Sequence, residues 1–140
     1  MASIRRSAAV TTIAVVNAVA GVLTLLFWTV VYFRLFYGSP ALDSAMRASL
    51  STTLGFLVGD VLWAVPLLFL SVVGLRRLRD WGWLLAQMVN VLWVYSMTVV
   101  WVRDLYAGSI SPGAVVFTPF ALVAVWATAY LWRARRDFGA

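Results

Sequence analysis

The chain contains no lysine, histidine, cysteine or glutamate among its 140 residues. Without cysteine it can form neither a disulfide nor a thiolate metal site. Without both cysteine and histidine it lacks the usual protein ligands of haem, iron–sulfur clusters, zinc and copper. The same absences exclude a Ser-His-Asp triad and a lysine Schiff base. We therefore expect neither a metal nor a cofactor.

Charge of either sign is also scarce. Only 11% of the residues are charged and 64% are hydrophobic, with a mean hydropathy of +0.93. Soluble domains average about 25% charged and about 45–50% apolar residues. This composition predicts a single integral membrane domain over residues 1–140. The net charge of +6 does not indicate a nucleic-acid partner, because the arginines cluster at the ends of apolar runs.

Four apolar runs are each long enough to cross a bilayer, which takes about 20 residues. They cover approximately residues 8–36, 54–75, 83–102 and 113–132. The first is too long for an upright helix, so we expect it to tilt or protrude. It is also too long for the apolar core of a cleavable signal peptide. Because the links are short, we expect an all-α fold, an up-down bundle of four membrane helices.

The arginines predict the orientation of this bundle. Eight of the eleven lie before the first run, between the second and third, or after the fourth, and three lie on the other side. The positive-inside rule therefore places both termini in the cytoplasm. We expect a multi-pass protein of the cell's inner (plasma) membrane. The exclusive use of arginine as the basic residue is typical of a GC-rich bacterial genome.

Asp60 is the only carboxylate inside an apolar run. A charge at the centre of a membrane helix costs about 2.5–3.5 kcal/mol on insertion scales, so such a residue indicates a functional site by default. Two other interpretations of Asp60 are structural. The carboxyl is either protonated and donates a hydrogen bond, or it pairs with Arg34 or Arg103 reaching inward from the outer interface.

Each helical residue adds about 1.5 Å of depth, so we expect residues 24–28 of the first run near the depth of Asp60, together with polar side chains of the third and fourth runs. Pro66 and Pro119 each free a backbone carbonyl, and kinks there would open the outer half of the bundle into a cavity. An acid beside aromatic rings suits an amphipathic cation, although the rings alternatively only fill the core. The candidate ligand-binding residues are Asp60, Trp63, Trp93, Tyr95, Ser96 and Thr118, with Asn17 and Asn90 at the floor.

Asn17 on the first run and Gln87 with Asn90 on the third form a deeper polar layer. Gln87 and Asn90 are three residues apart and share a helix face. Interhelical hydrogen bonds, worth about 0.6 kcal/mol each on average, explain such residues without a ligand. The alternative is that Asn17 and Asn90 line the floor of the cavity.

Small and aromatic residues predict how the helices pack. Gly55 and Gly59 have the spacing of a close helix contact, which we expect within the bundle, with a homodimer contact as the alternative. Trp28 and Trp101 are expected in the outer aromatic belt, and Arg103 is expected to form a surface ion pair with Asp104.

The outer loop between the first two runs is the longest. Its residues 40–50 are expected to form either a short surface helix or an ordinary ordered loop. The helix would present an apolar stripe of Leu42, Met46 and Leu50.

With these residues in place, the chain resembles the EXPERA fold, the family of emopamil-binding sterol isomerases and the sigma-2 receptor. The resemblance rests on the four-span topology, on Asp60 followed six residues later by Pro66, and on Phe117-Thr118-Pro119-Phe120. It implies a cavity for sterols or amphipathic amines with Asp60 as counter-ion. The His and Glu residues of the isomerases are missing, so it does not imply isomerase activity. The chain also resembles small bacterial four-span families with no assigned activity, through Trp81-Gly82-Trp83.

These observations favour a small membrane protein that binds or transports a lipophilic or cationic ligand. The alternative is a non-catalytic accessory or scaffold subunit of a membrane complex. A lipid enzyme would have only Asp60 with Tyr, Ser and Thr helpers as general acid or base, so we expect a protein that is not an enzyme. Expected partners are the bilayer, a small amphipathic or cationic ligand, and a second copy or another membrane protein.

Overall fold

The computed structural model describes residues 7–37 and 44–138, and all its regular elements are helical. The first span is α1 (Ala8–Tyr37). The second is continuous and consists of α2 (Ser44–Gly59), the π-helical turn η1 (Asp60–Ala64) and α3 (Val65–Arg76). The third and fourth spans are α4 (Asp80–Ala107) and α5 (Pro112–Arg133), followed by the short 3-10 turn η2 (Arg135–Asp137).

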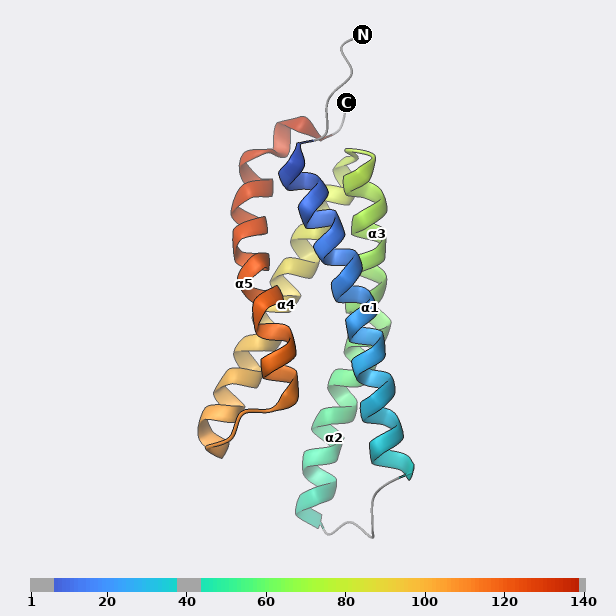
Figure 1. Ribbon diagram of the computed structural model, residues 1–140, viewed down its shortest axis with the longest axis vertical. Helices are drawn as coiled ribbons and strands as arrows, with labels where there is room; N and C mark the ends of the chain where they lie inside the picture. Colours follow the sequence, from blue (N-terminus) through green and yellow to red (C-terminus); the bar gives the residue numbers. More distant parts are fainter. Residues whose placement is uncertain (1–6, 38–43, 139–140) are drawn as a thin grey trace.

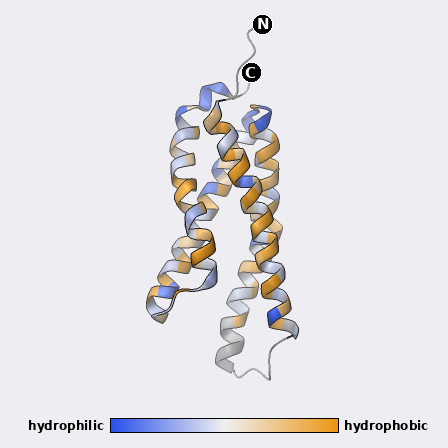
Figure 2. Ribbon diagram, viewed as in Figure 1, coloured by the Kyte–Doolittle hydropathy of each residue, from blue (hydrophilic) through white to orange (hydrophobic). Residues whose placement is uncertain are grey.

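Four segments of these helices are long and apolar enough to cross a membrane: Ala8–Leu35, Leu50–Arg76, Asp80–Ala107 and Pro112–Arg133. Successive spans run in opposite directions (Figure 1). Apolar residues dominate along the helices, and hydrophilic residues gather at the end drawn uppermost (Figure 2). The prediction of an all-helical protein with four membrane-length helices is therefore confirmed.

The helices are joined most tightly at the end where α1 begins and α5 ends. There α3 packs between α1 and α4, and α4 packs against α5. The Ser7 hydroxyl hydrogen-bonds the Tyr130 hydroxyl at 2.8 Å, which ties the start of α1 to the end of α5. We call this the inner end and the opposite half of the bundle the outer half, as names for position within the molecule only. Its buried core includes Val10, Ile13, Leu75, Leu131 and Phe138.

The closest helix approach lies between α3 and α4, at Gly74 and Gly82. A Cβ on either glycine would overlap the backbone of the other. By contrast, no described atom lies within 4 Å of a Cβ built on Gly55 or Gly59. The expectation that Gly55 and Gly59 pack closely within the bundle is therefore wrong. The physical reason is that α2 diverges from α4 in the half of the bundle away from the inner end (Figure 1), and no other described helix comes within 4 Å of a Cβ built on these glycines.

Two helix boundaries differ from the sequence predictions. The second span is already helical from Ser44 and remains so through Leu50, so residues 44–50 belong to it and not to a separate surface helix. The side chains of Leu42 and Met46, on which the predicted stripe depends, lie outside the described residues. The third span continues beyond residue 102 to Ala107, and Gly108, with a left-handed φ of 61°, ends it.

The π-helical turn η1 arises where the second span approaches Pro66. Proline has no N–H to donate to the carbonyl of Leu62, and its ring crowds that carbonyl. The backbone adapts one turn earlier, where the N–H of Val65 bonds the carbonyl of Asp60, five residues back. Asp60 therefore opens a π-turn, a feature that occurs frequently at functional sites.

Candidate ligand-binding cavity

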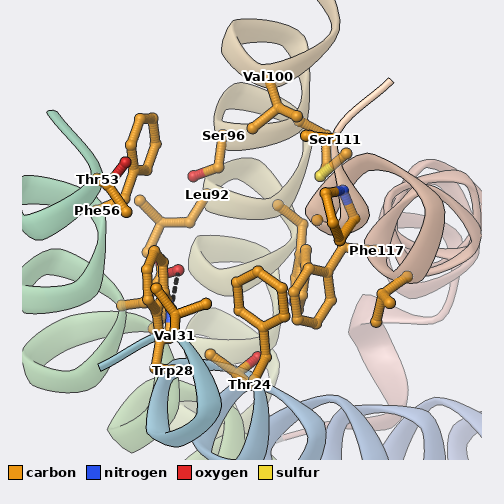
Figure 3. A pocket seen from close by; sticks show the side chains of 18 of the residues that line it. Thr24, Trp28, Val31, Thr53, Phe56, Leu92, Ser96, Val100, Ser111 and Phe117 are labelled. Carbon is orange, nitrogen blue, oxygen red and sulfur yellow. Dashed lines mark hydrogen bonds between the residues drawn. The ribbon is translucent and has the colours of Figure 1, made fainter. Parts of the chain in front are cut away.

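A cavity of about 360 Å³ lies in the outer half of the bundle, between α1, α2 with η1, α4 and the start of α5. We call it the outer cavity. Its volume falls within the range of about 300–1,000 Å³ that is usual for small-molecule sites. Figure 3 shows side chains from these helices converging on it. Its aromatic lining consists of Phe27, Trp28, Phe56, Trp93 and Phe117.

Asp60 lies in the wall of the outer cavity, held by one indole. Its Oδ2 accepts a hydrogen bond of 2.8 Å from Nε1 of Trp28 on α1, the bond dashed in Figure 3. Trp28 is only 8% exposed, so it does not belong to the aromatic belt in which the sequence placed it. Among the described residues, Oδ1 of Asp60 has no hydrogen-bond partner, and neither Arg34 nor Arg103 pairs with the carboxylate.

Two of the predicted ligand-binding residues line the outer cavity with Asp60. These are Trp93 and Ser96, both on α4. Trp63 and Tyr95 instead face away from it and are 68% and 66% exposed. The π-turn places more residues in each turn, so Trp63 does not return to the helix face of Asp60. Tyr95 precedes Ser96 by one residue and therefore points about 100° away around α4.

Thr118 does not line the outer cavity but joins α4 to α5. Its hydroxyl accepts a 2.9 Å hydrogen bond from Nε1 of Trp101 and donates one of 2.6 Å to the carbonyl of Ala114. Both hydrogen-bonding capacities of this hydroxyl are therefore used within the protein.

Asn17 and Asn90 lie inward of the outer cavity. They line a separate void of about 10 Å³, and Trp93 borders both spaces. Asn17 donates from Nδ2 to the hydroxyl of Ser71 on α3 at 2.9 Å, an interhelical bond of the expected kind. Asn90 is 1% exposed, and its Nδ2 has no partner among the described residues.

Gln87, the third member of the deeper polar layer, links α4 to α5. Its Nε2 donates to the carbonyl of Thr128 at 3.2 Å, while its buried Oε1 has no partner in the described part of the chain.

The outer rim of the cavity carries two arginines that the sequence did not assign to the site. Arg34 is the outermost lining residue of α1, and Arg103 is the outermost lining residue of α4. Arg103 forms the expected ion pair with Asp104, at 2.7 Å. The other oxygen of Asp104 accepts a 2.7 Å hydrogen bond from the N–H of Ser111, which fixes the start of α5 beside the rim.

Trp28 is the residue of the site that sequence reasoning missed most clearly. Depth counting placed residues 24–28 level with Asp60, and the Trp28 indole does reach that level, since it bonds the carboxylate. The rotation of α1, which turns the Trp28 indole toward Asp60, leaves no trace in an apolar run that is hydrophobic all round. Phe27 illustrates the same difficulty, since its ring meets Phe117 of α5 at 5.1 Å across the cavity.

The donor set limits the chemistry of the outer cavity. Its charged lining groups are one carboxylate and two guanidinium groups. Its walls also carry the three hydroxyls of Thr24, Thr53 and Ser96, and Ser111 lies at the rim. The described residues hold no cluster of three or more acidic, histidine or cysteine side chains suited to a metal ion. No protein-family model, curated protein or solved structure matches this chain, so the resemblance to the EXPERA fold stays a prediction.

Proposed function

We propose that the protein binds or transports a small amphipathic or cationic ligand in the outer cavity, with Asp60 as its polar anchor. One observation carries the proposal. The carboxylate of Asp60 lines an aromatic cavity of small-molecule size and has one oxygen without a partner. Exposing a carboxylate to an apolar space inside a membrane is costly, and a bound cation offsets that cost.

The surroundings of Asp60 suit an organic cation better than a metal ion. Trp28 fixes one carboxylate oxygen, so the other is held in place before a ligand arrives. The rings of Trp93 and Phe117 lie 5.4 Å apart in the cavity wall. Their faces attract alkylammonium groups, by about 0.5–2 kcal/mol for each ring that is engaged, and their area accommodates hydrocarbon.

Thermal stabilisation of the purified full chain by decyltrimethylammonium tests this proposal. Asp60→Asn keeps an acceptor for the Trp28 indole but removes the charge. Because a hydrogen bond or ion contact to a charged group contributes about 1.5–3 kcal/mol, we expect binding at least about tenfold weaker. Ser96→Trp, which fills the cavity from α4, is expected to abolish binding.

Tyr95→Leu is the matched control, because Tyr95 neighbours Ser96 on α4 but faces outward. It is expected to bind the probe like the wild type. Equal stabilisation of the wild type, Asp60→Asn and Ser96→Trp would refute the proposal, since the probe would then bind elsewhere on the protein.

A second candidate function is a scaffold or accessory subunit, and the open faces of Gly55 and Gly59 favour it. A Cβ built on either glycine would meet no other helix of the described part of the chain within 4 Å, and such faces let a helix of another chain approach closely. Native mass spectrometry from a mild detergent tests this alternative. A stoichiometric complex that dissociates in Gly55→Leu but not in Tyr95→Leu supports it, and a monomer in all three proteins argues against it.

A further inference from the structure

The lining of the outer cavity changes with depth in a regular order. On α1 it extends from Thr24 to Arg34, a rise of about 15 Å. The α4 contribution runs in the same direction as that of α1, from Val89 on the inner side to Arg103 at the outer side. The cavity therefore has an inner level, a middle level at Asp60 and an outer rim, and each level has a different chemistry.

The inner level is apolar. Val89, Trp93 and Ala64 line it. Thr24 is the one polar side chain there among the described lining residues, and its hydroxyl donates at 2.8 Å to the carbonyl of Ala20 in its own helix. Since this hydroxyl is already used, the inner level suits hydrocarbon.

The middle level carries the carboxyl group of Asp60. Oδ1 of Asp60 has no described partner, and the hydroxyl of Ser96, which also lines the cavity, makes no hydrogen bond with a described residue. Both oxygens are acceptors available to a cationic group. Trp28, bonded to the other carboxylate oxygen, marks this level on α1.

The outer rim carries a positive charge. Arg103 is neutralised by Asp104, whereas Arg34 forms no ion pair with any described residue. The first turn of α5 lines the same rim. There Ser111 caps the N–H of Ala114, and the N–H of Gly113 has no hydrogen bond in the described part of the chain. The Arg34 guanidinium group suits an anion.

Among the described lining residues, an ionised Asp60 in the middle would therefore balance Arg34 at the rim. Trp28 and Arg34 are six residues apart on α1, about 9 Å along the helix axis. A simple cation would pair with Asp60 but leave Arg34 without a partner among the described residues at the mouth. We infer that the ligand is a zwitterionic amphiphile of the betaine type, in which a hydrocarbon chain, a cationic group and an anionic group follow in that order. This inference rests on the proposed function and names its ligand class.

Matched ten-carbon amphiphiles test the order of the charges on the purified full chain in a nonionic maltoside. The probes are decyltrimethylammonium, the decyl sulfobetaine with chain, cation and anion in order, and decylphosphocholine with the two charges reversed. We expect the sulfobetaine to bind about tenfold more tightly than either other probe. One additional charge-assisted contact of about 1.4 kcal/mol would produce this difference in affinity. Glycine betaine, which has both charges but no chain, is expected to bind more than a hundredfold more weakly.

Two variants separate the charges. Arg34→Gln is expected to remove the preference for the sulfobetaine while leaving binding of decyltrimethylammonium intact or tighter. Arg76→Gln removes an exposed arginine at the inner end and is expected to keep the preference.

The inference is overturned if decyltrimethylammonium or decylphosphocholine binds the wild type as tightly as the sulfobetaine does. It is also overturned if the preference survives Arg34→Gln, or if glycine betaine binds as well as the chain-bearing probe. These results leave the proposed function standing when decyltrimethylammonium binding still depends on Asp60. Failure of every probe to distinguish the wild type from Ser96→Trp refutes the proposed function itself.

Discussion

Replacing Trp28 by Phe and Asp60 by Leu, singly and together, measures the free energy with which the two side chains interact. Each single change also alters packing and the desolvation of the carboxylate. The double-mutant cycle cancels these separate effects and leaves the pairwise interaction. The pair joins α1 to η1 through a single hydrogen bond of 2.8 Å between Nε1 and Oδ2, so the coupling reports that bond.

The expected coupling energy is about 1.5 kcal/mol. Hydrogen bonds to charged groups contribute about 1.5–3 kcal/mol in proteins, whereas interhelical hydrogen bonds in membrane proteins average about 0.6 and reach about 1.7 kcal/mol. Trp28 is 8% exposed and its acceptor is a carboxylate, which places this bond near the top of the membrane range. The upper protein values are not expected, because the unfolded chain in the membrane also finds hydrogen-bond partners.

Unfolding in mixed maltoside and dodecyl sulfate micelles, followed by circular dichroism, provides the four free energies of the cycle. The control cycle combines Trp101→Phe with Thr118→Val, which removes an exposed indole-to-hydroxyl bond of 2.9 Å and is expected to couple by about 0.6 kcal/mol or less. A Trp28–Asp60 coupling below about 0.5 kcal/mol, or one no larger than the control, would refute the assignment of Trp28 as the partner that orients Asp60.

Two further pairs of variants test the packing by the same unfolding measurement. Gly74→Ala is expected to lower the free energy of unfolding by about 1–3 kcal/mol because its Cβ would overlap the Gly82 backbone. Gly55→Ala, with open space around the added Cβ, is expected to leave the free energy of unfolding unchanged. Equal effects of the two substitutions would contradict the close contact between Gly74 and Gly82. Asn90→Leu is expected to leave the free energy of unfolding unchanged or raise it by about 1 kcal/mol, since the buried Nδ2 of Asn90 has no described partner. Asn17→Leu is expected to lower the free energy of unfolding by about 0.6 kcal/mol, because the interhelical hydrogen bond to Ser71 is lost. The opposite order for the two asparagines would refute the assigned hydrogen bonding.

Helix existence could be predicted closely, but the position of each helix end could not. The run that begins the first span was expected from residue 8, and α1 begins at Ala8. The second span begins earlier than expected, at Ser44, because its first turns are polar and hydropathy does not detect them. The third extends to Ala107 because helical structure tolerates the polar Arg103 and Asp104, while Gly108 stops it.

The candidate site was predicted in depth but not in rotation. Counting residues along each helix placed Asp60 level with residues 24–28 and Ser96, and of these Thr24, Phe27, Trp28 and Ser96 do line one cavity with Asp60. Rotation decides which side chains face inward, and it depends on packing against neighbouring helices. Trp63 and Tyr95 were therefore assigned to the site although both are exposed, and Arg34 was not assigned to it although it lies at the rim.

The sequence by itself determined that the chain forms four membrane-length helices, that thiolate and histidine metal sites, thiol chemistry and a Ser-His-Asp triad are excluded, and that Asp60 is the costly residue to explain. These conclusions follow from transfer free energies and from the atoms that each residue type possesses, neither of which depends on neighbours. Only the tertiary structure decided that Trp28 holds Asp60, that Gly74 meets Gly82, and that the outer half separates around a cavity. Those features depend on how four helices, each apolar on every side, rotate and tilt against one another, and packing alone sets that rotation.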